Sequence, residues 1–152
     1  MKLILVRHGE ADPNRNGADS QRRLTDVGHQ QAELTADYIA ENFRPDLFVV
    51  SPYIRAQQTL AHLQQKFPDV PVQVYKDITP DDPAAPAVHW LSNLTQETVV
   101  VVCHMNIVAY IGALLTEDVP EAFELAEARV YEHPVIMVGL SQQTDRFVPQ
   151  LK

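Results

Sequence analysis

The chain has 152 residues, of which 45% are hydrophobic and 21% charged, and we expect a single domain over residues 1–152. Its formal net charge of −8 argues against nucleic acid or an anionic membrane as a partner, because such binding needs a basic surface. The single cysteine, Cys103, excludes an internal disulfide and a cysteine-based metal cage. We therefore expect a cytoplasmic protein.

The charge is distributed unevenly along the chain. Residues 1–30 contain five basic and four acidic groups, a net of +1, which leaves −9 for the other residues to reach the total of −8. An acidic protein with clustered arginines indicates a small anion site. The first apolar run has only four residues before Arg7, so it is too short for a signal peptide or a membrane span.

The first predicted elements are a buried strand over residues 3–6 and a long helix. The strand is an unbroken apolar run. Thr25 and Asp26 offer N-caps for the helix, which we expect to end near Phe43, before Pro45. Its predicted apolar face consists of Val27, Leu34 and Tyr38.

The middle of the chain repeats this alternation. A second apolar run predicts a buried strand over residues 47–50, and a helix is expected to begin near Pro52. A shorter strand is predicted over residues 72–75. The apolar positions of the helix are Ala56, Leu60, Leu63 and Phe67.

Four further elements complete the prediction. A loop rich in Pro and Asp precedes a helix over residues 87–94, and a third buried strand is predicted over residues 99–103. The segment after His104 is apolar nearly all round, which predicts a deeply buried helix. Two later strands are expected over residues 129–138 and 146–151.

Strands that alternate with helices predict an α/β domain with a mainly parallel central sheet flanked by helices on both faces. Ligands of such sheets bind beyond the carboxyl ends of the strands. The three buried strands are followed by Arg7 and His8, by a segment that contains Arg55, and by His104. We therefore expect two arginines and two histidines at one rim of the sheet.

These residue types are suited to phosphoryl transfer. Guanidinium groups present paired donors that match phosphate oxygens, and the helix opening after His104 adds backbone N–H groups and partial positive charge. A neutral His8 between two arginines can attack phosphorus, because its cationic neighbours lower its pKa. Arg7, Arg55 and His104 would meet the charge on the phosphoryl oxygens, and Gly9 would let the backbone approach the ligand closely.

Five segments carry a more specific signal, and they are "VRHGEA" at 6–11, "RRLTDVGHQQA" at 22–32, "VVSPYIRAQQT" at 49–59, "DITP" at 77–80 and "VVCHMNIVAYIG" at 101–112. In order and spacing they resemble the histidine phosphatase superfamily and, within it, the small SixA-type phosphohistidine phosphatases. The resemblance implies a fold like that of the phosphoglycerate mutases. It also implies that the protein uses no metal or other cofactor.

The resemblance implies a role for particular residues. His8 would be the phosphorylated nucleophile, Arg7, Arg55 and His104 would form the phosphate pocket, and Arg22 would be an additional substrate contact. Asp77 stands where larger members place a glutamate general acid, with Asp81 and Asp82 close enough to compete. Arg23 replaces the usual proline after the first arginine, so either Arg22 or Arg23 faces the pocket.

We predict a phosphatase that acts on a phosphorylated protein, such as a histidine phosphotransfer domain in signal transduction, through a phosphorylated His8. Imidazole as a leaving group needs less protonation by a positioned acid than an alkoxide does. The segment of about 30 residues between Phe67 and Val99 leaves little material for a lid over the pocket, so a phosphorylated side chain of another protein could enter. Two alternatives stay open: a phosphomonoesterase of the same superfamily that acts on a small metabolite, and a non-catalytic module that binds phosphoproteins.

Overall fold

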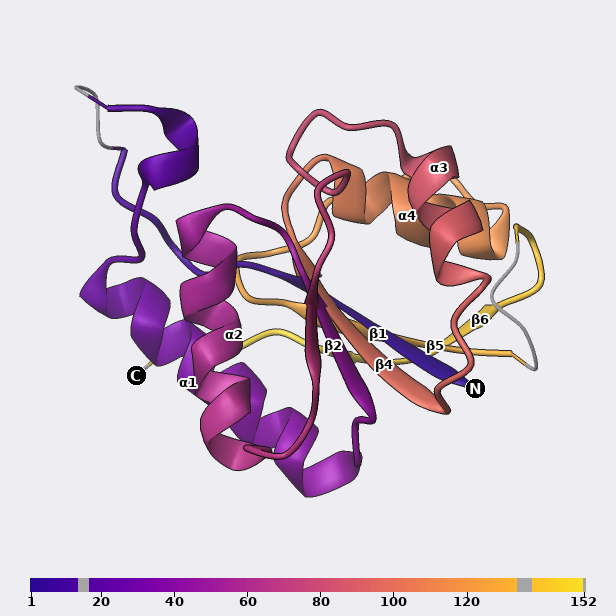
Figure 1. Ribbon diagram of the computed structural model, residues 1–152, viewed down its shortest axis with the longest axis horizontal. Coiled ribbons are helices and arrows are strands. Elements are labelled where there is room, and N and C mark those ends of the chain that lie inside the picture. The colour runs from indigo at the N-terminus through magenta and orange to yellow at the C-terminus, as the bar shows by residue number, and fades with distance from the viewer. Residues whose placement is uncertain (14–16, 134–137, 152) are drawn as a thin grey trace.

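The computed structural model describes residues 1–13, 17–133 and 138–151, and in this part of the chain six strands form one sheet with helices on both faces (Figure 1). The strands are β1 (Lys2–Arg7), β2 (Leu47–Val50), β3 (Val72–Val74), β4 (Thr98–Cys103), β5 (Ala128–Glu132) and β6 (Gln142–Phe147). The helices are the short 3-10 helix η1 (Asp19–Gln21), α1 (Asp26–Asn42), α2 (Ile54–Lys66), α3 (Ala84–Leu91) and α4 (Ile107–Thr116).

The strand order is β3-β2-β4-β1-β5-β6, and the first four strands are parallel. β5 runs antiparallel to β1, and β6 runs antiparallel to β5. The three strands predicted as buried, β1, β2 and β4, are neighbours in the middle of the sheet. Their carboxyl ends therefore meet at one edge, as expected for a mainly parallel α/β sheet.

Each face of the sheet carries its own hydrophobic cluster. On one face α1 and α2 pack Ile39 and Leu60 against alternate strand residues such as Phe48. On the other face α3 and α4 pack Leu91 and Ile111 against the intervening strand residues. Successive side chains of a strand point to opposite faces, so strands covered on both sides must be apolar throughout. The predicted fold class is confirmed.

The predicted apolar face of α1 was only partly right, since Tyr38 packs against the core but Val27 does not, and the predicted N-cap was right. Thr25 caps the helix by accepting a 3.0 Å hydrogen bond from the Gly28 N–H, but Val27 is 38% exposed. Small side chains on the buried face let the helix lie close to the sheet. A prediction based on large apolar residues therefore selects a different face of the helix. The buried face consists of Gly28, Ala32, Thr35, Ala36 and Ile39.

Other predicted elements need smaller corrections. α3 begins three residues before the predicted start, because Pro86 lies in its first turn, where a missing N–H costs no hydrogen bond. α4 is buried on most sides, but Tyr110 is 54% exposed. The last strand is β6, which overlaps only the start of the predicted segment because its exposed, polar sequence carries no hydrophobic pattern. The predicted strand 129–138 includes residues 134–137, which lie outside the described residues.

Candidate functional site

The carboxyl ends of β1, β2 and β4 place three polar residues side by side. His8, Ser51 and His104 each follow one of these strands directly. The His8 N–H donates to the Cys103 carbonyl at 3.0 Å, and the Ser51 N–H donates to the Val102 carbonyl at 3.1 Å. The sheet hydrogen bonding therefore continues one residue past the strands, and it brings the imidazole rings of His8 and His104 to a centroid distance of 5.1 Å.

The hydrogen bonds of His8 define which of its ring nitrogens is free to react. Nδ1 lies 2.6 Å from the Gly9 carbonyl oxygen, which can only accept, so we assign the imidazole proton to Nδ1. Nε2 accepts a 3.2 Å hydrogen bond from the Arg55 Nε–H. Burial, followed by the positive charges of Arg55 and Arg7, lowers the pKa of His8 to about 4. The ring is therefore neutral at pH 7, with its lone pair on Nε2.

His104 is held by Ser51, the residue that follows β2. Its Nε2 lies 2.7 Å from the Ser51 hydroxyl, which also accepts from the Tyr53 backbone N–H at 3.2 Å. The hydroxyl still has its own proton to donate, so we assign Nε2 as its acceptor and Nδ1 as the protonated nitrogen. Burial and the neighbouring His8 lower the pKa of His104 to about 2, which keeps the ring neutral.

Arg55 reaches the His8 ring from the first turn of α2 and is 3% exposed. Its Nε bonds His8, while its Nη1 donates to the Asp19 backbone oxygen at 2.7 Å and its Nη2 to the Asp19 carboxylate at 3.1 Å. The guanidinium lies 5.0 Å from the centre of the Tyr53 ring, which also contacts His104. Each nitrogen of the Arg55 guanidinium thus has a partner.

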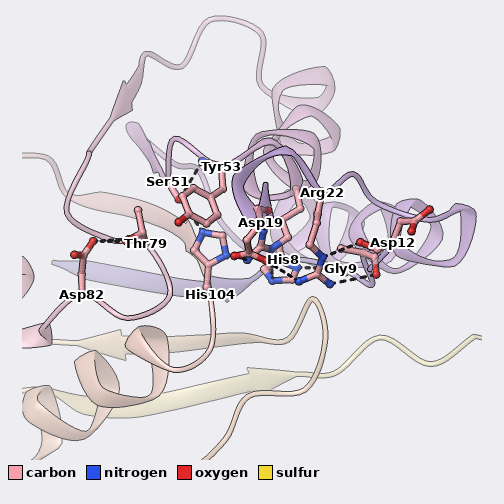
Figure 2. A network of polar contacts seen from close by, with 12 residues as sticks. His8, Gly9, Asp12, Asp19, Arg22, Ser51, Tyr53, Thr79, Asp82 and His104 are labelled. Atoms are coloured by element: carbon pink, nitrogen blue, oxygen red, sulfur yellow. Dashed lines mark hydrogen bonds and ion pairs between the residues drawn. The ribbon is translucent and has the colours of Figure 1, made fainter. Parts of the chain in front are cut away.

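Of the two consecutive arginines, Arg22 is the one that faces this network. Its Nη1 pairs with the Asp19 carboxylate at 3.0 Å, and its Nε donates to the Asp12 carbonyl at 2.7 Å (Figure 2). Arg23 is exposed. The η1 segment therefore links Arg22 to Arg55 through one carboxylate.

Arg7, at the end of β1, is fixed by a loop from the far end of the chain. Its Nη1 donates to the Phe123 carbonyl at 2.7 Å. Among the residues that the structure describes, its Nε and the His104 Nδ1 are two of three buried side-chain nitrogen and oxygen atoms with no hydrogen-bond partner. Two buried polar groups at this rim therefore lack a hydrogen-bond partner within the described part of the chain.

The loop that fixes Arg7 is organised by a buried ion pair. Glu127 is fully buried and binds the Arg129 Nε at 2.6 Å and the Arg146 Nε at 2.7 Å. Arg129 also donates to the carbonyls of Glu121 and Ala122, at 3.1 and 2.7 Å. These bonds define the path of the backbone on either side of the carbonyl that Arg7 uses.

The structure gives a reason for Gly9 that does not involve a ligand. A Cβ atom at this position would lie 2.5 Å from the Gly28 carbonyl oxygen, so any side chain here would collide with the first turn of α1. The Gly9 N–H donates to the Thr59 hydroxyl at 3.1 Å. Contact between Gly9 and substrate stays a prediction, and the close approach that the structure shows is to α1.

Asp77 is the predicted candidate for a general acid. It is half-buried in the loop before α3, and among the described contacts none joins it to His8, Arg55 or His104. Its charge acts on Tyr75, whose pKa is raised by burial and then by Asp77. Of its two competitors, Asp81 is exposed, and Asp82 accepts from both the N–H and the hydroxyl of Thr79, at 2.8 and 2.7 Å (Figure 2).

Comparison with known proteins decides the family. Residues 3–79 match the sequence profile of the histidine phosphatase superfamily (branch 1). The phosphohistidine phosphatase SixA homolog of Haemophilus influenzae is 32% identical over 127 residues, which cover 76% of this chain and 77% of that protein. The chain belongs to the histidine phosphatase superfamily. The predicted resemblance is thereby confirmed, and with it the assignment to the SixA-type phosphatases.

Solved structures of the superfamily share the fold. The structure of the protein histidine phosphatase SixA complexed with tungstate is 24% identical and superposes with a TM-score of 0.87 over 97% of both chains. The putative phosphohistidine phosphatase SixA from Agrobacterium tumefaciens is 20% identical, with a TM-score of 0.86 over 97% of both chains. At these identities the likeness concerns the fold alone.

Several residues of this histidine phosphatase were missed in the sequence. Three of them lie inside the segment 49–59, which already carried the resemblance, so their position was a usable signal. Asp19, three residues before Arg22, carried no such signal in the sequence. The ion pair between Glu127 and Arg129, which shapes the loop beside Arg7, forms only in the folded chain. The missed residues are Ser51, Tyr53, Thr59, Asp19, Glu127 and Arg129.

The described residues offer no obvious place for a metal. Among them, no group of three or more His, Cys, Asp or Glu side chains is arranged so that it could hold a metal ion. Within the same residues, no helix is both long and apolar enough to cross a membrane.

Proposed function

We propose that this chain is a phosphohistidine phosphatase that acts on a phosphorylated protein, with His8 as the nucleophile. The observation that carries the proposal is the neutral His8 ring, whose unprotonated Nε2 faces the Arg55 guanidinium beside two buried polar groups without partners. The name of the Haemophilus influenzae relative and the tungstate of the SixA structure support it, since tungstate is a tetrahedral oxyanion like phosphate.

The first step transfers the phosphoryl group to His8. Nε2 attacks phosphorus, the P–N bond of the substrate breaks, and the substrate imidazole leaves as a neutral ring when its other nitrogen is protonated. The new phosphohistidine keeps its proton on Nδ1, where the Gly9 carbonyl accepts it and stabilises the positive ring. Arg55, Arg7 and the Nδ1–H of His104 would bind the phosphoryl oxygens, which carry most of the developing charge.

The second step returns the enzyme to its starting state. Water attacks the phosphorus of phospho-His8, the P–N bond breaks, and dihydrogen phosphate leaves behind a neutral His8 with its lone pair on Nε2. Because both leaving groups are neutral imidazoles, neither step requires a strong acid. The neutral form of His8 is favoured by its lowered pKa, about 4.

A protein substrate and a cytoplasmic setting fit the other features of the chain. The Asp19 and Arg22 side chains, which line the outer side of the arginine network, are 54% and 28% exposed. A phosphorylated side chain on another protein could approach from that side. Cys103, the one cysteine of the sequence, is buried and forms no disulfide, and disulfides are rare in cytoplasmic proteins.

We retain Asp77 as the proposed general acid for substrates that need one. An alkoxide leaving group must be protonated, and a positioned acid contributes about 10²–10⁴-fold to such a step. Asp77→Asn should then slow the turnover of phosphate esters and leave phosphohistidine turnover unchanged. If Asp77→Asn abolishes ester turnover while His8 still becomes phosphorylated, and esters are the better substrates, the chain is a phosphomonoesterase.

One experiment separates the proposed function from its alternatives. The purified chain is incubated with a phosphorylated histidine phosphotransfer domain and, separately, with a panel of small phosphate esters. His8→Ala is the test variant, and His89→Ala, which removes an exposed histidine of α3, is the matched control. Phosphate release and phosphorylation of the enzyme are followed by mass spectrometry.

The expected result is rapid phosphate release from the phosphotransfer domain, with an acid-labile phosphate trapped on His8. Both should disappear in His8→Ala and persist in His89→Ala. Turnover of esters without turnover of the phosphoprotein would contradict the proposed substrate class. Binding of the phosphoprotein with no phosphate release and no phosphoenzyme would identify a binding module.

A further inference from the structure

The proposed phosphate pocket already contains an anion that belongs to the chain itself. One carboxylate, that of Asp19, bridges two arginines: Oδ2 pairs with the Arg55 Nη2 at 3.1 Å and Oδ1 with the Arg22 Nη1 at 3.0 Å. Figure 2 shows Asp19 between His8, His104 and Arg22. Burial lowers the pKa of His104, and the Asp19 carboxylate opposes that effect, so the carboxylate also acts on the second imidazole.

Three of the five N–H groups of the Arg55 guanidinium are already engaged, so a phosphoryl group that binds through the paired Nη donors competes with Asp19. Its Nη1 is bonded to the Asp19 backbone oxygen and its Nη2 to the Asp19 carboxylate, while its Nε bonds His8. Guanidinium groups bind phosphate best through two parallel N–H groups. The side of Arg55 that carries both Nη atoms is the side that Asp19 occupies.

Asp19 is the more displaceable partner of the pair. The Arg55 side chain is 4% exposed and the Asp19 side chain 54%. Asp19 begins a 3-10 helix of three residues that buries none of its side chains and has no side-chain cap. An isolated buried guanidinium is costly, so Asp19 stabilises Arg55 in the ligand-free protein, and a second anion can replace it at Arg55.

We propose that Asp19 is an internal competitor for the phosphoryl group and sets the phosphate affinity of the pocket. In the free enzyme its single negative charge is shared between Arg55 and Arg22. A bound phosphoryl group displaces it from Arg55 because that group also reaches the unpartnered Arg7 Nε and His104 Nδ1, to which Asp19 makes no described hydrogen bond. The competition weakens binding of free phosphate and of small esters, and it favours substrates that make further contacts with the enzyme.

This inference rests on the proposed function only for the location of the phosphate pocket. Binding of inorganic phosphate by the 152-residue chain tests it without any turnover, by isothermal titration calorimetry at constant pH and ionic strength. The variants are Asp19→Asn and Asp19→Ala. Asp37→Asn is the matched control, since it removes the same charge from an ion pair, with Lys66 at 2.7 Å, on another part of the surface.

Both Asp19 variants should bind phosphate roughly fivefold more tightly than the unmodified chain, and Asp37→Asn should bind it unchanged. A lower KM for a small ester, without a matching rise in kcat, should accompany the tighter binding. A loss of structure cannot produce tighter binding, so the direction of the change separates competition from a supporting role.

Equal or weaker phosphate binding by both Asp19 variants would contradict the inference and show that Asp19 only positions Arg55. A change of the same size in Asp37→Asn would also contradict it, because net charge would then explain the effect. The proposed function fails separately, when the unmodified chain releases no phosphate from the phosphorylated domain.

Discussion

The candidate site has two parts that are built differently. His8, Arg55 and His104, called the buried group below, are 7%, 3% and 0% exposed and extend from strand ends or the first turn of a helix. Asp19 and Arg22, called the exposed pair, come from η1 and the residue after it, and their side chains are 54% and 28% exposed. The buried group is fixed by the strand ends and the start of α2, whereas the exposed pair is fixed by ion pairs and by hydrogen bonds to backbone oxygens.

This difference indicates a division of labour. Chemistry on phosphorus needs a nucleophile and donors placed to within a fraction of an ångström, which rigid strands provide. Selection among substrates needs contacts that can be exchanged for others, which a short exposed segment provides. Substitutions in the buried group should therefore change kcat or stability, and substitutions in the exposed pair should change binding by smaller factors.

The largest effect is expected for Arg55→Ala. It removes the guanidinium that bonds the His8 Nε2 and that would bind the phosphoryl oxygens. We expect kcat to fall by about 10³-fold, as when a preorganised donor to a developing oxyanion is lost. Steady-state kinetics with the phosphorylated domain measure it. A loss of activity that appears only as a higher KM, with kcat unchanged, would show that Arg55 belongs functionally with the exposed pair.

The support of Arg7 should be the most sensitive point for stability. Glu127→Ala leaves Arg129 buried without its carboxylate partner, and we expect the free energy of unfolding to fall by about 4 kcal/mol. Arg146→Ala removes a half-exposed partner of the same carboxylate and should cost less than about 1 kcal/mol. Urea unfolding measures both. Equal losses would mean that burial of this ion pair is not what matters.

The buried neutral state of His8 should also appear in the pH dependence of stability. The folded protein lowers the pKa of His8 from 6.5 to about 4, so the unfolded chain binds this proton first as the pH falls. The stabilisation is complete above pH 6.5 and is lost as the pH falls towards 4, by about 3 kcal/mol. His8→Gln should remove this part of the slope in unfolding measured from pH 7 to 4. An unchanged slope would contradict the prediction.

Ser51→Ala tests whether the proton position on His104 matters. Without the hydroxyl, the His104 Nε2 loses its 2.7 Å hydrogen bond, and the ring can place its proton on either nitrogen. We expect kcat to fall about tenfold, the lower range for loss of a group that orients a functional histidine. Chemical shifts of the ring nitrogens should report the mixed protonation. Unchanged shifts and kcat would show that Ser51 is not needed.

The smallest effect is expected in the exposed pair. Arg22→Ala should raise KM for the phosphoprotein about threefold and leave kcat unchanged, because exposed charges contribute little to binding. Arg23→Ala, at the neighbouring exposed position, should change neither constant. A larger effect of Arg23→Ala than of Arg22→Ala would show that Arg23, and not Arg22, contacts the substrate.

Much of the fold was predictable because the strand signal is local. The buried strands are unbroken apolar runs, and β2 was predicted at its observed bounds, Leu47–Val50. The buried face of α1 was not predictable in the same way, because it is lined by Gly, Ala and Thr and depends on how closely the helix approaches the sheet. β6 has polar, exposed residues and is recognisable only by its pairing with β5.

By itself, the sequence determined that the chain forms a mainly parallel α/β sheet and that His8 and His104 follow buried strands, since strand composition and order along the chain are local properties. It also indicated the family, because five motifs that resemble those of the superfamily occur in order. Only the tertiary structure decided that His8 presents Nε2, that Arg22 faces inward, and that Asp19 bridges two arginines. Those facts depend on hydrogen bonds and ion pairs between distant segments, such as Asp19 and Arg55, 36 residues apart, which form only when the chain has folded.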